Sequence, residues 1–156
     1  MMIDFSKVGS GNSADTVLFP RDIFNALPKK NAAKFQYPRD VQSQVWAKWF
    51  ERRNENSLVL KLNTGSGKTV VGLLALKSCL NEGKFPAVYV CPDPYLVKQV
   101  MDAAEELGVE VTNDANSPRF LSGKSVLVVN IHKLVNGKSV FGVGDEGVKL
   151  GICSLV

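Results

Sequence analysis

The chain has 156 residues, which is enough for one domain with a substantial core. Hydrophobic residues make up 45% and charged residues 22% of it, so a disordered or fibrous protein is excluded. The net charge of +4 permits binding to nucleic acid but does not establish it.

The chain is expected to begin with a polar leader and a short helix, residues 1–34, ahead of the main domain, residues 35–156. Its first 17 residues are polar and rich in glycine and serine, so we expect a loose segment. Pro20 and Pro28 then flank an apolar stretch, and proline is favoured in the first turn of a helix and just beyond its end. This pattern predicts a short helix that packs on the main body.

From residue 41 onward, predicted helices alternate with short apolar strands. Helices are expected over residues 41–53, 67–82 and 95–107. Their end signals are Asp40 as an N-cap and Gly83 and Gly108 as C-terminal caps. Strands are expected over residues 57–62, 87–91, 109–112, 125–129 and 152–156, with a polar turn over residues 113–118. The alternation predicts an α/β fold in which helices cover both faces of a parallel sheet.

One segment, LKLNTGSGKT from residue 60 to residue 69, has the pattern of a phosphate-binding loop. Its glycines allow a tight turn with backbone N–H groups aimed at phosphate oxygens, and the following helix adds the positive end of its dipole. Lys68 would reach the outer phosphates, and the Thr69 hydroxyl would hold Mg²⁺. We therefore expect ATP and Mg²⁺ to be bound by Thr64, Gly65, Ser66, Gly67, Lys68 and Thr69.

The octet LNTGSGKT also resembles the first motif of superfamily 2 helicases. These enzymes tolerate another residue where most phosphate loops have their first glycine, and here that residue is Leu62. Upstream, YPRDVQSQVW resembles the Q motif of the same helicases, with Pro38, Val41 and Gln42 in its positions. The resemblance implies that Gln42 reads the adenine edge, because an amide offers both a donor and an acceptor. Gln44 is the alternative.

Two later segments resemble helicase motifs that contact the nucleic-acid backbone. CPDPYLVKQV is similar to P-T-x-E-L-x-x-Q, although the basic and acidic residues of that motif are replaced. VLVVNIHKLVNG is similar to a strand followed by T-P-G-R-L, with a lysine in place of the arginine. Lysine keeps the charge but loses the two-pronged hydrogen bond. The resemblance implies contacts with DNA or RNA from Pro92, Gln99, Asn130 and Lys133.

Together, residues 35–156 resemble the first RecA-like domain of a bacterial superfamily 2 helicase of the DEAD/DEAH-box type, incomplete at its C-terminus. In that family an acidic D-E-x-D or D-E-x-H motif follows the strand that residues 152–156 resemble. Asp145 and Glu146 precede this strand, so they do not supply the motif. We therefore expect an N-terminal piece of an ATP-dependent helicase or translocase that binds nucleotide without hydrolysing it.

Two other functions stay open at this stage. A small-molecule phosphotransferase with a phosphate loop usually keeps the first glycine and needs an arginine-rich lid, and neither is found. A non-catalytic nucleotide-binding module would fit the missing acidic motif. The sequence does not separate DNA from RNA as the partner.

The cysteines, Cys79, Cys91 and Cys153, lack C-x-x-C spacing, and His132 is the single histidine. Neither a zinc site nor a disulfide framework is therefore expected. The first residues contain no apolar secretory signal, and no apolar run approaches the roughly 18 residues of a membrane helix. A cytoplasmic protein is expected.

Overall fold

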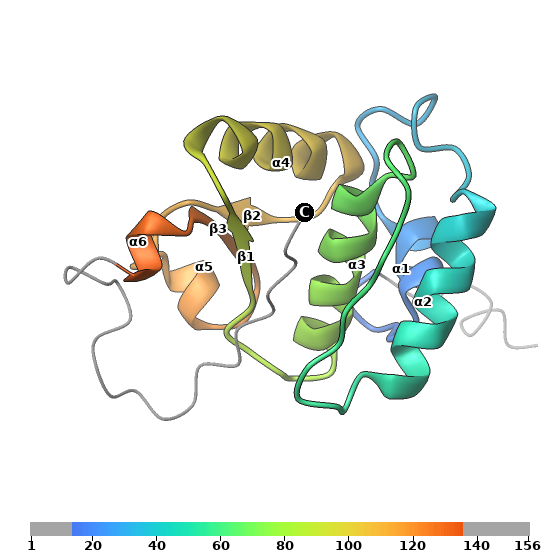
Figure 1. Ribbon diagram of the computed structural model, residues 1–156, viewed down its shortest axis with the longest axis horizontal. Coiled ribbons are helices and arrows are strands. Elements are labelled where there is room, and N and C mark those ends of the chain that lie inside the picture. Colours follow the sequence, from blue (N-terminus) through green and yellow to red (C-terminus); the bar gives the residue numbers. More distant parts are fainter. Residues whose placement is uncertain (1–13, 136–156) are drawn as a thin grey trace, which may run out of the picture.

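The computed structural model describes residues 14–135, drawn in colour in Figure 1. The strand predicted over residues 152–156 lies outside this range, as do Asp145 and Glu146. Six helices and three strands are found within it. The helices are α1 (Pro20–Ala26), α2 (Asp40–Arg52), α3 (Lys68–Asn81), α4 (Pro94–Leu107), α5 (Pro118–Leu121) and α6 (His132–Val135). The strands are β1 (Val88–Cys91), β2 (Val111–Thr112) and β3 (Val126–Asn130).

The three strands form a parallel sheet in the order β1-β3-β2. In β1 every residue is buried, and in β3 every residue except the last is buried, as is typical of strands covered on both sides. The register places Cys91 opposite Asn130, so β1 and β3 end at the same edge of the sheet. The predicted parallel α/β architecture is confirmed.

Alternate side chains of the sheet face two different layers. Tyr89 and Val128 lie in the larger cluster with α3 and α4, whereas Val90 and Val129 pack with Phe120 of α5 in a second, smaller cluster. In Figure 1, α3 and α5 lie on opposite sides of β1. Helices therefore cover both faces of the sheet, as predicted.

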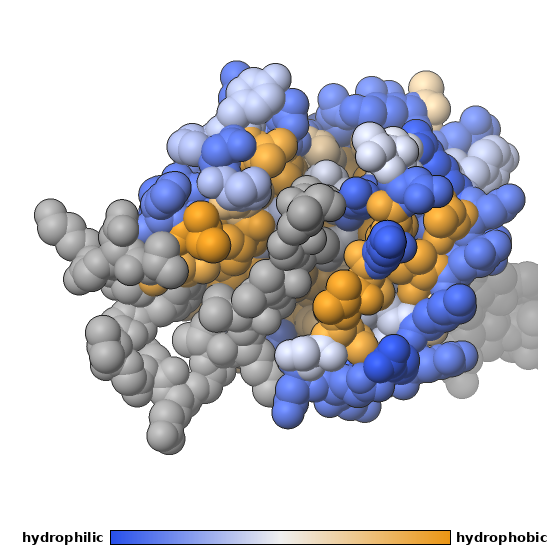
Figure 2. Space-filling model, viewed as in Figure 1, coloured by the Kyte–Doolittle hydropathy of each residue, from blue (hydrophilic) through white to orange (hydrophobic). Residues whose placement is uncertain are grey.

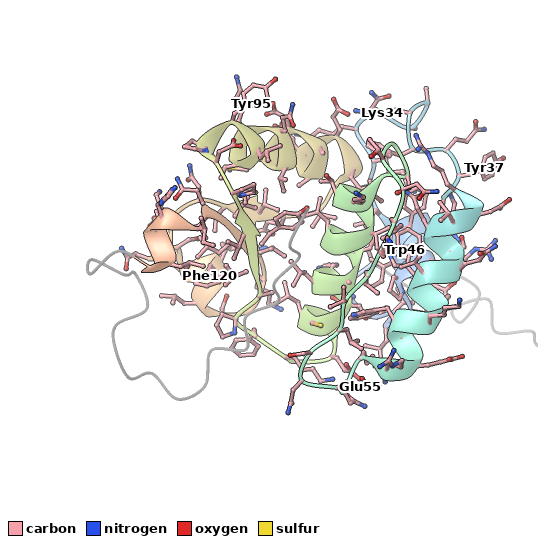
Figure 3. The ribbon with its side chains drawn as sticks, in the orientation of Figure 1. Lys34, Tyr37, Trp46, Glu55, Tyr95 and Phe120 are labelled. Carbon is pink, nitrogen blue, oxygen red and sulfur yellow. The ribbon has the colours of Figure 1, made fainter. Side chains whose placement is uncertain are left out.

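Helix α3 lies between the sheet and helices α1 and α2 (Figure 1). It is apolar around most of its circumference because it has neighbours on several sides. Trp46 of α2 is fully buried, and its indole Nε1 donates a hydrogen bond to the Val71 carbonyl at 3.2 Å. Figure 3 shows Trp46 between α2 and α3. Helix α3 is thus held from several directions.

The N-terminal segment is part of the same core. In α1, Ile23 and Phe24 are 0% and 1% exposed, which confirms the predicted short helix that packs on the body. The loose segment predicted before it is wrong for residues 14–17. There Asn81 Nδ2 donates to the carbonyls of Ala14 and Val17, both at 2.7 Å. The domain boundary between residues 34 and 35 stays a prediction.

The strand predicted over residues 57–62 is wrong for the described part of the chain, in which these residues pair with no strand. Leu60 and Leu62 still pack against the core, but Val59 is 94% exposed. The apolar character of this run accounts for the packing of Leu60 and Leu62, but a strand also requires a neighbouring backbone to bond with. In Figure 2, apolar side chains gather over α3, on the face of the molecule that is turned to the viewer.

Several element ends differ from expectation by a few residues. The N-cap of α2 is Arg39 and not Asp40, because Asp40 already lies within the first turn, where its charge suits the helix dipole. Gly83 and Gly108 end α3 and α4 in the left-handed conformation, as predicted. Helices α5 and α6 were not predicted, since four residues are too few to show a helical period. No helix within residues 14–135 is long and apolar enough to cross a membrane.

Candidate nucleotide site

The segment 63–67 makes a tight turn that leads directly into α3. Gly65 and Gly67 have φ angles of +79° and +81°, which other residues rarely adopt. Between them, the N–H and the hydroxyl of Ser66 both donate to the Asn63 carbonyl, at 3.2 and 2.7 Å. Gly67 is the N-cap of α3, so Lys68 and Thr69 are its first two residues. The tight turn expected from the glycines is therefore present at the start of α3.

The start of α2 binds three successive carbonyl groups of this turn. Arg39 Nη1 donates to the Gly65 carbonyl. Gln42 Nε2 donates to the carbonyls of Ser66 and Gly67, at 3.2 and 3.4 Å. The Gln42 side chain is buried, and its Oε1 accepts the Arg39 backbone N–H at 3.0 Å. Two residues from one helix end thus hold the loop from the side of its carbonyls.

This arrangement fits a bound phosphate chain. In a trans peptide the C=O and the following N–H point in opposite directions. Because the Ser66 and Gly67 carbonyls face Gln42, the N–H groups of Gly67 and Lys68 face away from it. Space is open beside the loop, since a Cβ added to Gly65 would meet no atom within 4 Å. Backbone donors at a helix start, next to a lysine and a threonine, suit phosphate and Mg²⁺ respectively.

The residues predicted to touch nucleic acid lie mostly at the carboxyl edge of the sheet. Pro92 follows β1 and Asn130 ends β3, and the Ile131 N–H donates to the Cys91 carbonyl at 2.8 Å. Asn130 Oδ1 accepts a hydrogen bond from the Lys133 N–H at 3.2 Å, at the start of α6. The structure thus brings Pro92, Asn130 and Lys133 to one edge. Gln99 is exposed on α4, one turn beyond its start.

A groove of about 770 Å³ runs between α4 and the sheet, and Asn130 and Lys133 line it at one end. Val128 of β3 and Met101 of α4 also line it. Of the three carboxylates that line it, Glu105 and Glu110 are each paired with a cation. A hydrogen bond from Lys30 lowers the pKa of Glu105, and one from Arg119 lowers the pKa of Glu110. Within the described residues, Lys98 and Lys133 of this groove take part in no ion pair, and the same holds for Asp102, which also lines it.

Sequence reasoning missed Arg39 as a contact of the loop. It lies inside the segment that resembles the Q motif, three residues before Gln42, so its position was available as a signal. Its partner, the Gly65 carbonyl, is 26 residues away in sequence, and no local pattern reports such a contact. Among residues 14–135, no three His, Cys, Asp or Glu side chains come together as a metal site.

A family model described as "Type III restriction enzyme, res subunit" (ResIII) matches residues 36–142, which is more than half of the chain. No curated protein and no solved structure is similar enough to count as a match.

The match covers both groups of candidate residues, the loop with Gln42 and the edge of the sheet with Lys133. ResIII domains are ATP-binding domains of superfamily 2 helicases and restriction enzymes. They bind ATP with Mg²⁺, and the family acts on DNA. The parallel α/β sheet, with its flanking helices, is consistent with this type of domain. The chain belongs to the ResIII family.

Proposed function

We propose that this chain binds ATP with Mg²⁺ through residues 63–69, as the ATP-binding part of a DNA helicase or translocase. The observation that carries the proposal is the turn at Gly65 and Gly67, which opens α3 with Lys68 as its first residue. Residues 35–156 would form the first RecA-like domain, preceded by the segment 1–34. The narrower DEAD/DEAH-box assignment rests on the order of the helicase-like motifs alone.

The proposal assigns a role to each residue of the loop. The N–H groups of Gly67 and Lys68 donate to phosphate oxygens, and Thr64, Gly65 and Ser66 shape the turn around them. The ammonium group of Lys68 balances the charge of the outer phosphates, and the Thr69 hydroxyl supplies a ligand to Mg²⁺. Mg²⁺, when bound, neutralises part of the phosphate charge. The printed sequence contains no D-E-x-D or D-E-x-H motif, so we propose binding without hydrolysis for these residues.

The proposal extends to DNA at the carboxyl edge of the sheet. Pro92, Asn130 and Lys133 meet at this edge, and Lys98 lies in the adjoining groove. Phosphate groups of a strand would be held by the two lysines and by backbone and amide donors. Gln99 is assigned a contact with the same strand from the exposed face of α4. The family match supports DNA as the partner over RNA.

Lys68→Ala tests the nucleotide site. We expect the affinity for ATP with Mg²⁺ to fall by about tenfold to hundredfold, the worth of a charge-assisted hydrogen bond. The measurement is isothermal titration calorimetry of the 156-residue chain, with phosphate release read from the same samples.

Lys61→Ala, which removes an exposed lysine seven residues earlier, is the matched control and should bind as the wild type does. Equal ATP affinity in the wild type and in Lys68→Ala would reject the loop as the site. Phosphate release that Lys68→Ala abolishes would show that an acidic ligand for hydrolysis exists within this sequence.

A further inference from the structure

We infer that Tyr95 stacks on a base of single-stranded DNA at the carboxyl edge of the sheet. The inference rests on the proposed binding of DNA, and it deepens that proposal by naming the form of DNA that this edge takes, a strand with unpaired bases. Three observations carry it: the exposure of the Tyr95 ring, its neighbours on α4, and the shortage of phosphate donors where α4 begins.

The ring of Tyr95 is open to a ligand. Tyr95 is the second residue of α4 and is 70% exposed, whereas the core side of that helix is formed by Val100, Ala104 and Leu107. Figure 3 places Tyr95 on the side of α4 that is turned away from the sheet. Within residues 14–135, its side chain makes no hydrogen bond and no ring contact. An exposed aromatic face of this kind is what an unpaired base stacks on.

The ring also lies among the residues that the proposed function assigns to DNA. Strands β1 and β3 end together at the carboxyl edge, and α4 begins three residues after β1. Pro94, next to Tyr95, lines the same groove as Lys98 and Lys133. Residues three and four apart on a helix are neighbours, so Tyr95 lies beside Lys98 and Gln99 on the surface of α4. A base on the ring would thus have its own phosphate near a lysine.

The start of α4 has little to offer a phosphate group by itself. Asp93 Oδ1 accepts the Leu96 N–H at 2.9 Å, and the Asp93 carbonyl accepts the Val97 N–H at 3.3 Å. Pro94 has no N–H to donate. Two of the N–H groups at this helix start are therefore already bonded, a third is absent, and the negative charge of Asp93 opposes a phosphate. The exposed ring of Tyr95 is the feature of this helix start that suits a nucleic acid.

Charge in the groove is too nearly balanced to hold a strand alone. Asp102 lines the groove with Lys98, four residues before it on α4, and offsets part of the charge of the two lysines. A stacked base adds an attraction that does not depend on charge, and it strengthens binding about fivefold to hundredfold. In a duplex the faces of the bases are covered by their neighbours. The contact with Tyr95 therefore favours a single strand.

The experiment compares strands with and without bases. Fluorescent oligothymidine, an abasic strand of the same length and the matching duplex are titrated at low salt, and fluorescence anisotropy is measured. We expect Tyr95→Ala to bind oligothymidine about fivefold to hundredfold more weakly than the wild type, because one stacked base is lost. Its affinities for the abasic strand and for the duplex should equal those of the wild type.

Two further variants test the role of the ring. Tyr95→Phe keeps the aromatic face and should bind oligothymidine as the wild type does. Tyr37→Ala removes another exposed tyrosine, which precedes α2 and does not line the groove, and it should have no effect. Circular dichroism checks the folding of each variant. A loss in Tyr95→Phe as large as that in Tyr95→Ala would overturn the inference, since the hydroxyl and not the ring would then make the contact.

The dependence on salt separates stacking from phosphate binding. Stacking releases no counterion from a phosphate, so Tyr95→Ala should keep the wild-type slope of log affinity against log salt. A reduced slope would overturn the inference, and so would an equal loss on the oligothymidine and abasic strands. Unchanged affinity of Tyr95→Ala for oligothymidine would overturn it as well.

The failure of this inference differs from the failure of the proposed function. If the wild type binds none of the three DNA ligands, the proposed binding of DNA fails, and the role of Tyr95 fails with it. If the wild type binds oligothymidine and Tyr95→Ala binds it equally well, binding of DNA stands and the role of Tyr95 alone is rejected.

Discussion

Gly83 and Gly108 both adopt a left-handed backbone angle that favours glycine, but only at Gly108 does a neighbouring residue also exclude a larger side chain. Both follow a helix, with φ angles of +78° and +87°. In each case a backbone N–H just beyond the helix returns to its last turn: Lys84 to Cys79 and Val109 to Ala104, both at 2.9 Å. A Cβ at Gly83 would meet nothing within 4 Å, whereas one at Gly108 would lie 2.7 Å from the Pro28 carbonyl oxygen.

Gly108→Ala should therefore destabilise the protein more than Gly83→Ala. The left-handed angle alone costs about 1 kcal/mol in each variant. Gly108→Ala adds a collision with backbone that cannot move easily, for a further 1–3 kcal/mol or so. Urea unfolding of the two variants measures the difference. Equal midpoints would mean that the segment at Pro28 yields at little cost.

Among the elements, α2 contacts α3, or the loop that precedes α3, at its start, in its middle and just beyond its end. At its start Gln42 holds the loop, and in its middle Trp46 donates to the Val71 carbonyl. Beyond its end, Arg53 Nη2 lies 2.9 Å from Glu82 Oε1, and Arg53 also stacks on Phe50 with its guanidinium carbon 3.9 Å from the ring centroid. The helix that carries Gln42 therefore cannot shift without disturbing contacts at its other end.

The carboxylate of Glu82, which pairs with Arg53, makes the stability of the protein depend on pH. Hydrogen bonds from Lys84 and then Arg53 lower the pKa of Glu82 below its ordinary value of 4.5, against an opposing effect of burial. A lowered pKa means that this stabilisation is complete above pH 4.5 and is lost as the pH falls through the lower pKa of the folded state.

Glu82→Gln should therefore lower the free energy of unfolding at pH 7 by about 1 kcal/mol. The difference from the wild type should begin to shrink as the pH falls below about 4.5, where Glu82 of the unfolded chain becomes protonated, and it should disappear once the pH is below the lowered pKa of Glu82 in the folded state. Urea unfolding from pH 3 to pH 7 measures it. Glu55→Gln, at an exposed pair with Arg52, is the control and should have little effect at any pH. A pH-independent difference would assign the contribution of Glu82 to packing instead of charge.

At the scale of the whole molecule, the proposed binding of DNA would depend on charge. The net charge is +4, and Lys98 and Lys133 lie in the groove between α4 and the sheet. Each phosphate contact with a lysine releases a bound counterion, so affinity for DNA should fall steeply as salt rises.

Lys133→Ala should weaken binding of single-stranded DNA and reduce the slope of log affinity against log salt by about 0.7, the value for one lost phosphate contact on a single strand. Fluorescence anisotropy at several salt concentrations measures both quantities, with an RNA of the same length beside the DNA. Lys48→Ala, at an exposed lysine of α2 outside the groove, is the control. Slopes that match in Lys133→Ala and Lys48→Ala would remove Lys133 from the interface.

Much of the fold could be predicted from the sequence because its signals are local. The apolar runs at β1 and β3, the period of α4 and the glycines at positions 83 and 108 all act within a few residues. The strand expected over residues 57–62 was wrong for the described part of the chain because strand formation depends on a partner elsewhere. The leader at residues 14–17 was misjudged for the same reason, since its partner Asn81 is more than 60 residues away.

The sequence by itself determined the parallel α/β architecture and the place and shape of the loop at residues 63–69, because spacing and glycine content suffice for both. The tertiary structure alone decided what surrounds that loop. It joined Arg39 and Gln42 to the carbonyls of Gly65, Ser66 and Gly67, contacts that span 24–26 residues. The sequence does not say which groups a side-chain amide will contact. The packing of α2 against α3 determines which groups lie within its reach.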